Sequence, residues 1–315
     1  MKELKIFGVV AAFTLLLYWG VEPFAHGQMH KHVEGHGFVY DGTADIADAT
    51  EDKKEAKKAF WNEVNEIAEL QGNAAAGEAG YAMCMGCHME GAPAMGGVIP
   101  PVLDHAGALY DKKYLIALIK DPAMAMNTDH KFADTMMHPM GPVKTMFMDN
   151  QSIADVVAYV LENKAAEPTT KEAYEEACGR CHAMRYAKMT QIGDTPTFKY
   201  EKDALAHQIK ALEAQDAVKG YMGKLPPDLS MIIRARSHHF METFVENPQT
   251  QLPGTSMPRV GLNKEGYEKV EAFLTEIGDP SKPAREELGP KVLLFFLVFS
   301  ILAFLWKKYQ WRDLH

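Results

Sequence analysis

The sequence predicts a mainly α-helical protein in which two tandem domains lie between an N-terminal and a C-terminal transmembrane helix. A five-residue cysteine–histidine motif occurs twice in the chain. Apolar residues recur at steps of three and four around each copy, which is the spacing of amphipathic helices. Each end of the chain carries an apolar run with lysines beside it. A length of 315 residues agrees with two domains.

Both copies of the motif read Cys-x-x-Cys-His, which is the attachment signature of a c-type haem. Two thiols bond to one porphyrin, and the histidine that follows becomes the proximal ligand of the iron. A redox dithiol or a zinc site is the alternative, but neither needs a histidine after each cysteine pair. The two motifs use all 4 cysteines, so we predict two covalently bound haem c groups. The residues are Cys84, Cys87 and His88 in the first motif and Cys178, Cys181 and His182 in the second.

The composition limits the partners and the compartment. A net charge of −9 and a pI of about 5.8 argue against nucleic acid as a partner. Haem is attached to such motifs outside the cytoplasm, so the central part of the chain is expected in the periplasm. The chain shows no nucleophile–base pair and no phosphate-binding loop, so we expect an electron-transfer subunit that is not catalytic alone.

Both apolar runs are predicted to be membrane anchors. Ile6–Val21 follows Lys2 and Lys5, and no clean small-x-small cleavage site comes after it, which favours a retained anchor over a cleaved signal. Val292–Trp306 is slightly short for a span unless its flanks contribute, and Lys307-Lys308 follows it. Because basic flanks stay in the cytoplasm, we expect both termini there and both haem domains outside.

The same patterns divide the chain into six segments. Four histidines between His26 and His36 could bind a metal, but their spacing favours a polar loop near the membrane. Asp52–Leu70 is an amphipathic helix that should pack on the first haem domain or on a neighbouring subunit. The predicted segments are an anchor at 1–25, the His-rich loop and amphipathic helix at 26–72, a first haem domain at 73–164, a linker at 165–170, a second haem domain at 171–285, and a C-terminal anchor and tail at 286–315.

The first haem domain resembles the small cytochrome c family. Helices are predicted at 74–83, 114–120 and 153–162, and Pro100-Pro101 follows the motif. In that family a proline carbonyl accepts a hydrogen bond from the proximal histidine, so the resemblance implies Pro101 as the partner of His88. The family's sixth ligand is a methionine that precedes the last helix, usually beside a proline. Met140 follows Pro139 and fits this pattern, with Met137 and then His138 as alternatives.

The second haem domain contains Leu225-Pro-Pro-Asp-Leu-Ser-Met-Ile-Ile-Arg-Ala-Arg236. This run resembles cytochrome c1, the haem-carrying subunit of the quinol–cytochrome c oxidoreductase (bc1 complex). The resemblance implies that Pro227 or its neighbour supports His182, and that Arg234 or Arg236 lies near the haem propionates. The expected sixth ligand of the second iron is Met257. It lies within Ser-Met-Pro, ahead of a helix predicted at 264–277. The competing ligands are His238 and His239.

The resemblance implies a dihaem c1-like subunit of a bacterial bc1 complex in the inner membrane. Such a subunit carries electrons from the Rieske iron–sulfur protein to a cytochrome c acceptor. Its implied partners are cytochrome b and the Rieske subunit, in a dimeric complex. A dihaem cytochrome c subunit of a terminal oxidase is the main alternative, and a dihaem peroxidase is another. The two halves could also derive from a dihaem cytochrome of the c4 type.

Overall fold

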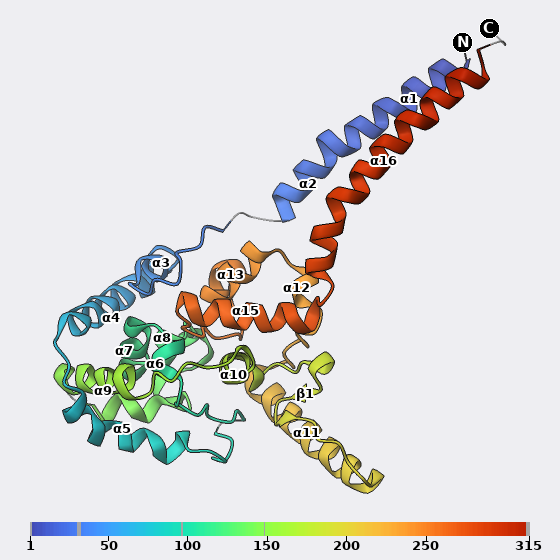
Figure 1. Cartoon of the computed structure of the whole chain (residues 1–315). Helices are drawn as coiled ribbons and strands as arrows, with labels where there is room; N and C mark the ends of the chain where they lie inside the picture. Colours follow the sequence, from blue (N-terminus) through green and yellow to red (C-terminus); the bar gives the residue numbers. More distant parts are fainter. Residues whose placement is uncertain (1, 30–32, 96, 148, 313–315) are drawn as a thin grey trace.

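The computed structural model is mainly helical, as the sequence predicts (Figure 1). It describes every residue except 1, 30–32, 96, 148 and 313–315. The described helices are α1 Lys2–Leu16, α2 Glu22–Met29, α3 Thr43–Ala47, α4 Glu51–Glu69, α5 Ala74–His88, α6 Ala106–Leu109, α7 Lys112–Lys120, α8 Pro122–Ala125, α9 Asn150–Asn163, α10 Thr170–Tyr174, α11 Glu201–Met222, α12 Ile232–Ala235, α13 His238–Glu246, α14 Pro248–Gln251, α15 Lys264–Gly278 and α16 Lys282–Gln310. Short 3-10 turns lie at 129–131, 135–137, 141–145 and 185–187, and a two-stranded hairpin joins β1 Met189–Thr190 to β2 Gly193–Asp194.

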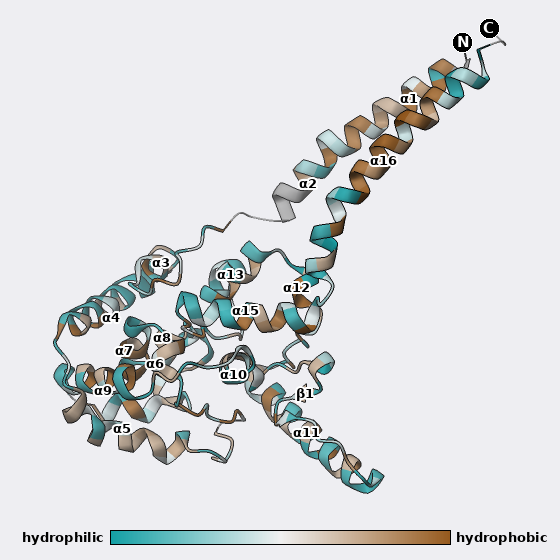
Figure 2. Cartoon of the chain, in the orientation of Figure 1, coloured by the Kyte–Doolittle hydropathy of each residue, from teal (hydrophilic) through white to brown (hydrophobic). Residues whose placement is uncertain are grey.

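Two long apolar helices project together from the body of the protein, and the two chain ends lie at their far end (Figure 1). The first runs through α1, a π-helical turn (Leu17–Val21) and α2, and its candidate membrane span is Leu4–Ala25. The second is α16. Figure 2 shows their apolar surfaces, which the rest of the chain leaves exposed. At about 1.5 Å per residue, α16 reaches across the ~30 Å hydrocarbon core when part of its more polar first ten residues is included. The two helices therefore indicate membrane anchoring.

The first haem domain is built on the crossing of α5 and α9. Asn73 caps α5 by accepting bonds from the amides of Ala75 and Ala76. The backbones of the two helices touch, because a Cβ atom at Gly77 would overlap the carbonyl group of Asp155. Helix α7 packs beside α9. The three helices predicted for this domain are therefore present, and α5 continues through the whole first motif.

The segment that the sequence predicts as a second haem domain repeats this arrangement with α10 and α15. A capping box between Thr169 and Glu172 starts α10. A π-helical turn, Glu175–Gly179, then carries the chain into the second motif. The buried rings of Tyr174 and Phe273 lie 5.0 Å apart where α10 crosses α15. In each domain, the helix that leads into the motif packs against the last helix of the domain.

Helix α4 packs against α7 and α9 of the first domain. Trp61, Val64 and Ile67 are buried along one face. The predicted amphipathic helix is confirmed, and it packs on the first domain of its own chain. Four histidines precede this helix. His30, His32 and the side chain of His26 lie outside the described residues. The backbone amide of His36 donates a hydrogen bond to Glu246 Oε2 at 2.9 Å.

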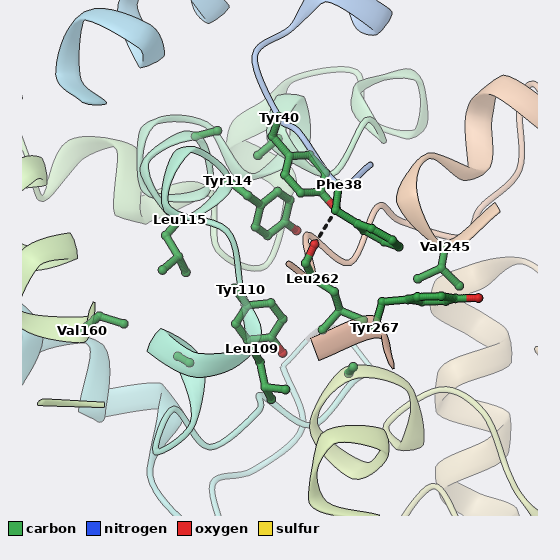
Figure 3. Close-up of a cluster of buried hydrophobic side chains, with 14 of the residues drawn as sticks. Phe38, Tyr40, Leu109, Tyr110, Tyr114, Leu115, Val160, Val245, Leu262 and Tyr267 are labelled. Carbon is green, nitrogen blue, oxygen red and sulfur yellow. Dashed lines mark hydrogen bonds between the residues drawn. The ribbon is translucent and has the colours of Figure 1, made fainter. Parts of the chain in front are cut away.

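One continuous core joins the two domains, and Figure 3 shows its centre. The segment before α7 pairs with the segment before α15 through an isolated bridge between Tyr110 and Leu262. The hydroxyl of Tyr40 donates to the carbonyl of Leu262 at 2.9 Å (Figure 3). Gly261 has a φ of +79°, and a Cβ atom there would overlap the ring of Tyr114. Only glycine therefore fits at this point of the interface.

Candidate functional site

The first motif lies at the end of α5, where His88 is buried. The Nδ1 atom of His88 is 2.7 Å from the carbonyl oxygen of Pro101, which is the contact expected from the sequence. A carbonyl oxygen only accepts hydrogen bonds, so the ring must carry its proton on Nδ1. The lone pair of Nε2 is then left for a metal ion. Burial also lowers the pKa of His88, which favours the neutral ring that an iron ion needs.

The second motif has the same arrangement, built from more distant residues. The Nδ1 atom of His182 lies 2.8 Å from the carbonyl oxygen of Pro227, and burial lowers the pKa of this histidine as well. In both motifs the acceptor is the second residue of a Pro-Pro pair.

The Pro-Pro-Asp-Leu-Ser run is fixed to the segment that follows His182. The amide of Leu229 donates to the carbonyl of Ala183 at 3.0 Å. Asp228 accepts from the amides of Arg185 and Ser230, both at 3.0 Å. These bonds hold the Pro227 carbonyl in place beneath the His182 ring. The run therefore acts as a rigid support for the histidine.

No disulfide joins any of the four cysteines. Burial raises the pKa of Cys178 to about 12 and also raises the pKa of Cys84 and Cys181. A redox dithiol needs a cysteine with a depressed pKa, so this environment argues against that alternative. Two thiols followed by a neutral, oriented imidazole fit a covalently attached haem at each motif.

The loop before α9 carries the three candidates for the sixth ligand of the first iron. Met137 is 69% exposed, whereas Met140 is partly buried. The amide of Met140 donates to Nδ1 of His138 at 3.0 Å, so the neutral His138 ring carries its proton on Nε2. A protonated Nε2 cannot bind a metal ion. The identity of the sixth ligand of the first iron, Met140, Met137 or His138, stays a prediction.

His138 is buried, and its Nε2 atom has no hydrogen-bond partner among the described residues. Burial lowers the pKa of His138 to about 4. His138 is therefore a buried, neutral ring that accepts a hydrogen bond at Nδ1, which no pattern in the sequence indicates.

Met257 lies on the loop before α15 and is partly buried. This loop is held two residues later by Arg259, whose guanidinium is buried against the Asp45 carboxylate. The competing histidines have other partners. His238 Nδ1 contacts the Glu271 carboxylate, and His239 Nε2 lies 2.9 Å from the carbonyl oxygen of Val33.

The two arginines of the cytochrome c1-like run have partners that the sequence did not predict. Arg234 donates from Nε and Nη2 to Asp279 at 3.1 and 2.9 Å, at the junction of α15 and α16. The guanidinium of Arg236 lies 4.8 Å from the centre of the Phe240 ring. Arg234 therefore helps to fix the start of α16. A contact of either arginine with a haem propionate stays a prediction.

The sequence did not predict two polar contacts that link distant parts of the chain. His105, just after the first Pro-Pro pair, contacts the Glu176 carboxylate two residues before Cys178. Asp45 and Arg259 form a second link between distant segments, and this one is buried. The charge of these residues suggested that each needs a partner, but no pattern in the sequence showed which residue the partner is.

Comparison with known proteins identifies the first of the two domains. A family model described as Cytochrome c matches residues 74–164. The first domain is therefore a cytochrome c domain, which implies covalently bound haem c, and the chain is a cytochrome c-type electron carrier.

Two relatives are more distantly similar. The chain is 26% identical to the ammonia monooxygenase gamma subunit of Nitrosomonas europaea over 190 residues, or 46% of this chain and 81% of that protein. It is 23% identical to cytochrome c1 of Allochromatium vinosum over 215 residues, or 49% of this chain and 87% of that protein. No solved structure matches the chain.

Proposed function

We propose that this chain is a dihaem, c1-like subunit of a quinol–cytochrome c oxidoreductase. In this role it carries electrons from a Rieske iron–sulfur protein to a cytochrome c acceptor. The observation that carries the proposal is the bond between His182 and Pro227, which repeats that of His88 and Pro101 but lies outside the matched cytochrome c domain. The similarity to a cytochrome c1 and the two apolar terminal helices support it further.

A haem with histidine and methionine ligands supplies reversible one-electron transfer at a high potential. The residues of this chain fix where that group sits. Pro101 and Pro227 orient the two proximal histidines, and the loops before α9 and α15 present Met140 and Met257. His88 with Met140 and His182 with Met257 would ligate the two irons, which would favour electron transfer over binding of oxygen or peroxide.

Counting the haems tests the second site directly. We expect two haems for each full-length chain in a pyridine haemochrome assay. The double variant Cys178→Ala/Cys181→Ala should keep one haem, as should the matched variant Cys84→Ala/Cys87→Ala. If the wild-type chain binds a single haem, and if Cys178→Ala/Cys181→Ala leaves this haem content unchanged, the second motif does not bind haem.

We propose that the second domain faces the Rieske donor and the first domain faces the acceptor. This order follows from the c1-like sequence run in the second domain. Replacing Met257 with histidine should lower the potential of the second site and slow quinol-dependent reduction. Unchanged reduction kinetics in a variant with a lowered potential would count against this order.

Purification in mild detergent tests the partners. A tagged chain should bring down a cytochrome b and a Rieske protein, identified by mass spectrometry. Recovery of a copper–haem oxidase core instead would support the alternative, a dihaem cytochrome c subunit of a terminal oxidase.

The proposed location is the bacterial inner membrane, with the haem domains in the periplasm. The shared position of both chain ends and the basic residues Lys307, Lys308 and Arg312 support cytoplasmic termini (Figure 1). A C-terminal tag should resist protease in intact spheroplasts and become sensitive after lysis. Digestion of the tag in intact spheroplasts would contradict this orientation.

A further inference from the structure

Helix α11 extends away from the two haem domains (Figure 1). Its 22 residues span about 33 Å at 1.5 Å per residue. Ala211, Val218 and Met222 are buried along one face. Its C-terminal end is fixed by Lys131 of the first domain, whose Nζ donates to the carbonyl of Tyr221 at 3.3 Å. The helix is thus anchored to the body by one face and one end.

The opposite face of α11 carries an exposed apolar stripe. Leu205, Ile209 and Leu212 are 57%, 48% and 52% exposed. Lys202 and Asp216 are also exposed and continue the stripe at either end. The five positions are separated by three, four, three and four residues, which is the a/d spacing of a coiled-coil seam. Large side chains on this spacing are suited to packing against another helix.

The charges at the two ends of the stripe determine which helix fits. The stripe is centred on Ile209, with Lys202 and Asp216 equally far from it in opposite directions. If a second α11 packs antiparallel about Ile209, each Lys202 faces an Asp216 of the other copy. A parallel pair would place lysine against lysine and aspartate against aspartate. The stripe is therefore complementary to itself in the antiparallel direction.

The direction of α11 is compatible with such a pair in one membrane. Figure 1 shows α11 running across the direction of α1 and α16. In this pairing, α1 and α16 cross the membrane and α11 lies along its plane. Two copies related by a two-fold axis along the membrane normal then present their α11 helices to each other in antiparallel directions.

We propose that the exposed stripe of α11 is a homodimer contact, in which Ile209 lies on the two-fold axis and Lys202 pairs with Asp216 of a second copy. Two heptads are too short to form a stable coiled coil from free peptides. Here α11 is already folded against the body, and membrane anchors confine both copies to one plane, which raises their effective concentration. The inference depends on the α11 surface and not on the proposed electron donor or acceptor.

A single-cysteine experiment tests this contact on the full chain in mild detergent. The haem-attachment motifs contain all native cysteines, so Ile209→Cys introduces one additional thiol. On a two-fold axis the new residue faces itself, at a distance that a disulfide can bridge. Under mild oxidation most of this variant should run as a covalent dimer. Lys210→Cys is the matched control, because Lys210 is also exposed but lies about 100° round the helix from Ile209.

Charge reversal provides a second, independent measurement. In the Ile209→Cys background, Lys202→Glu or Asp216→Lys alone should strongly reduce the yield of the covalent dimer by facing like charges. The two changes together should restore it, because the pairs form again with opposite signs. Equal crosslinking of Ile209→Cys and Lys210→Cys, or no effect of either single reversal, would overturn the proposal. Haem content, measured on the same variants, should stay constant throughout.

Discussion

The buried pair of Asp45 and Arg259 offers the sharpest test of how the chain is held together. Their side chains are only 2% and 4% exposed. Arg259 Nη1 donates to Asp45 Oδ2 at 2.9 Å, a second guanidinium nitrogen contacts Oδ1, and Trp61 Nε1 donates at 2.8 Å. Asp45 belongs to α3, whereas Arg259 lies two residues after Met257. The pair thus ties the N-terminal segment to the proposed ligand loop of the second domain.

Replacing Asp45 with asparagine should cost about 3–5 kcal/mol, the usual loss when one partner of a buried ion pair is removed. The cost arises because Arg259 keeps its charge and loses its only carboxylate among the described contacts. Replacing Arg259 with methionine should also destabilise, since Asp45 is then the buried, unpaired charge. The double variant should lose clearly less than the sum of the two, because no charge remains buried without a partner.

Urea unfolding of the detergent-solubilised chain measures these differences. Trp61 is a convenient probe, because the other three tryptophans lie in or directly after the apolar terminal helices. The absorption of the methionine–iron bond should weaken before global unfolding in the Asp45 variant if the loop is loosened. Single variants that each cost under about 1 kcal/mol, with additive effects, would refute the reasoning.

The same pair predicts a pH dependence. Burial by itself raises the pKa of Asp45, but the charge and hydrogen bonds of Arg259 outweigh it and hold the pKa below the ordinary value of 3.8. A depressed pKa contributes stability that is complete above the pKa of the unfolded chain and is lost as the pH falls through the folded value. The wild type should therefore lose more stability than the double variant on acidification below about pH 4. Parallel loss in both proteins would contradict this assignment.

Three further predictions concern single residues. Met140→Leu should abolish the six-coordinate spectrum of the first haem, whereas the matched change Met137→Leu should leave it intact, as absorption and magnetic circular dichroism will show. Gly261→Ala should destabilise the chain by about 2–5 kcal/mol in urea unfolding, because the new side chain is strained at positive φ and overlaps the ring of Tyr114. The matched control is Gly254→Ala, which has the same φ but open space around it. It should cost only about 1 kcal/mol in the same assay. Asp279→Asn should loosen the start of the C-terminal helix and increase protease cleavage there, because two arginines lose a shared carboxylate.

Local patterns were enough to predict most of the helices. The expected helices at 52–70, 114–120, 153–162 and 264–277 correspond closely to α4, α7, α9 and α15. Each has a clear apolar face, and polar side chains cap α7, α9 and α15; these signals act within one or two turns. The hairpin at 189–194 was missed because strands of two residues are too short to show a pattern. Helix α11 runs from Glu201 to Met222, and Lys131 of the first domain contacts its last turn at the carbonyl of Tyr221.

The sequence by itself determined the two Cys-x-x-Cys-His motifs and the apolar ends, because these depend on residue types at short, fixed spacing or on composition. The proline partners of the two histidines were expected from family resemblance, as Pro101 and as Pro227 or its neighbour. Only the tertiary structure decided which distant side chains meet. It paired Asp45 with Arg259, gave Arg234 to Asp279, exposed Met137 and directed the Met140 amide to His138. Such contacts depend on how the two domains pack around one core, and no local pattern encodes the partner of a side chain two hundred residues away.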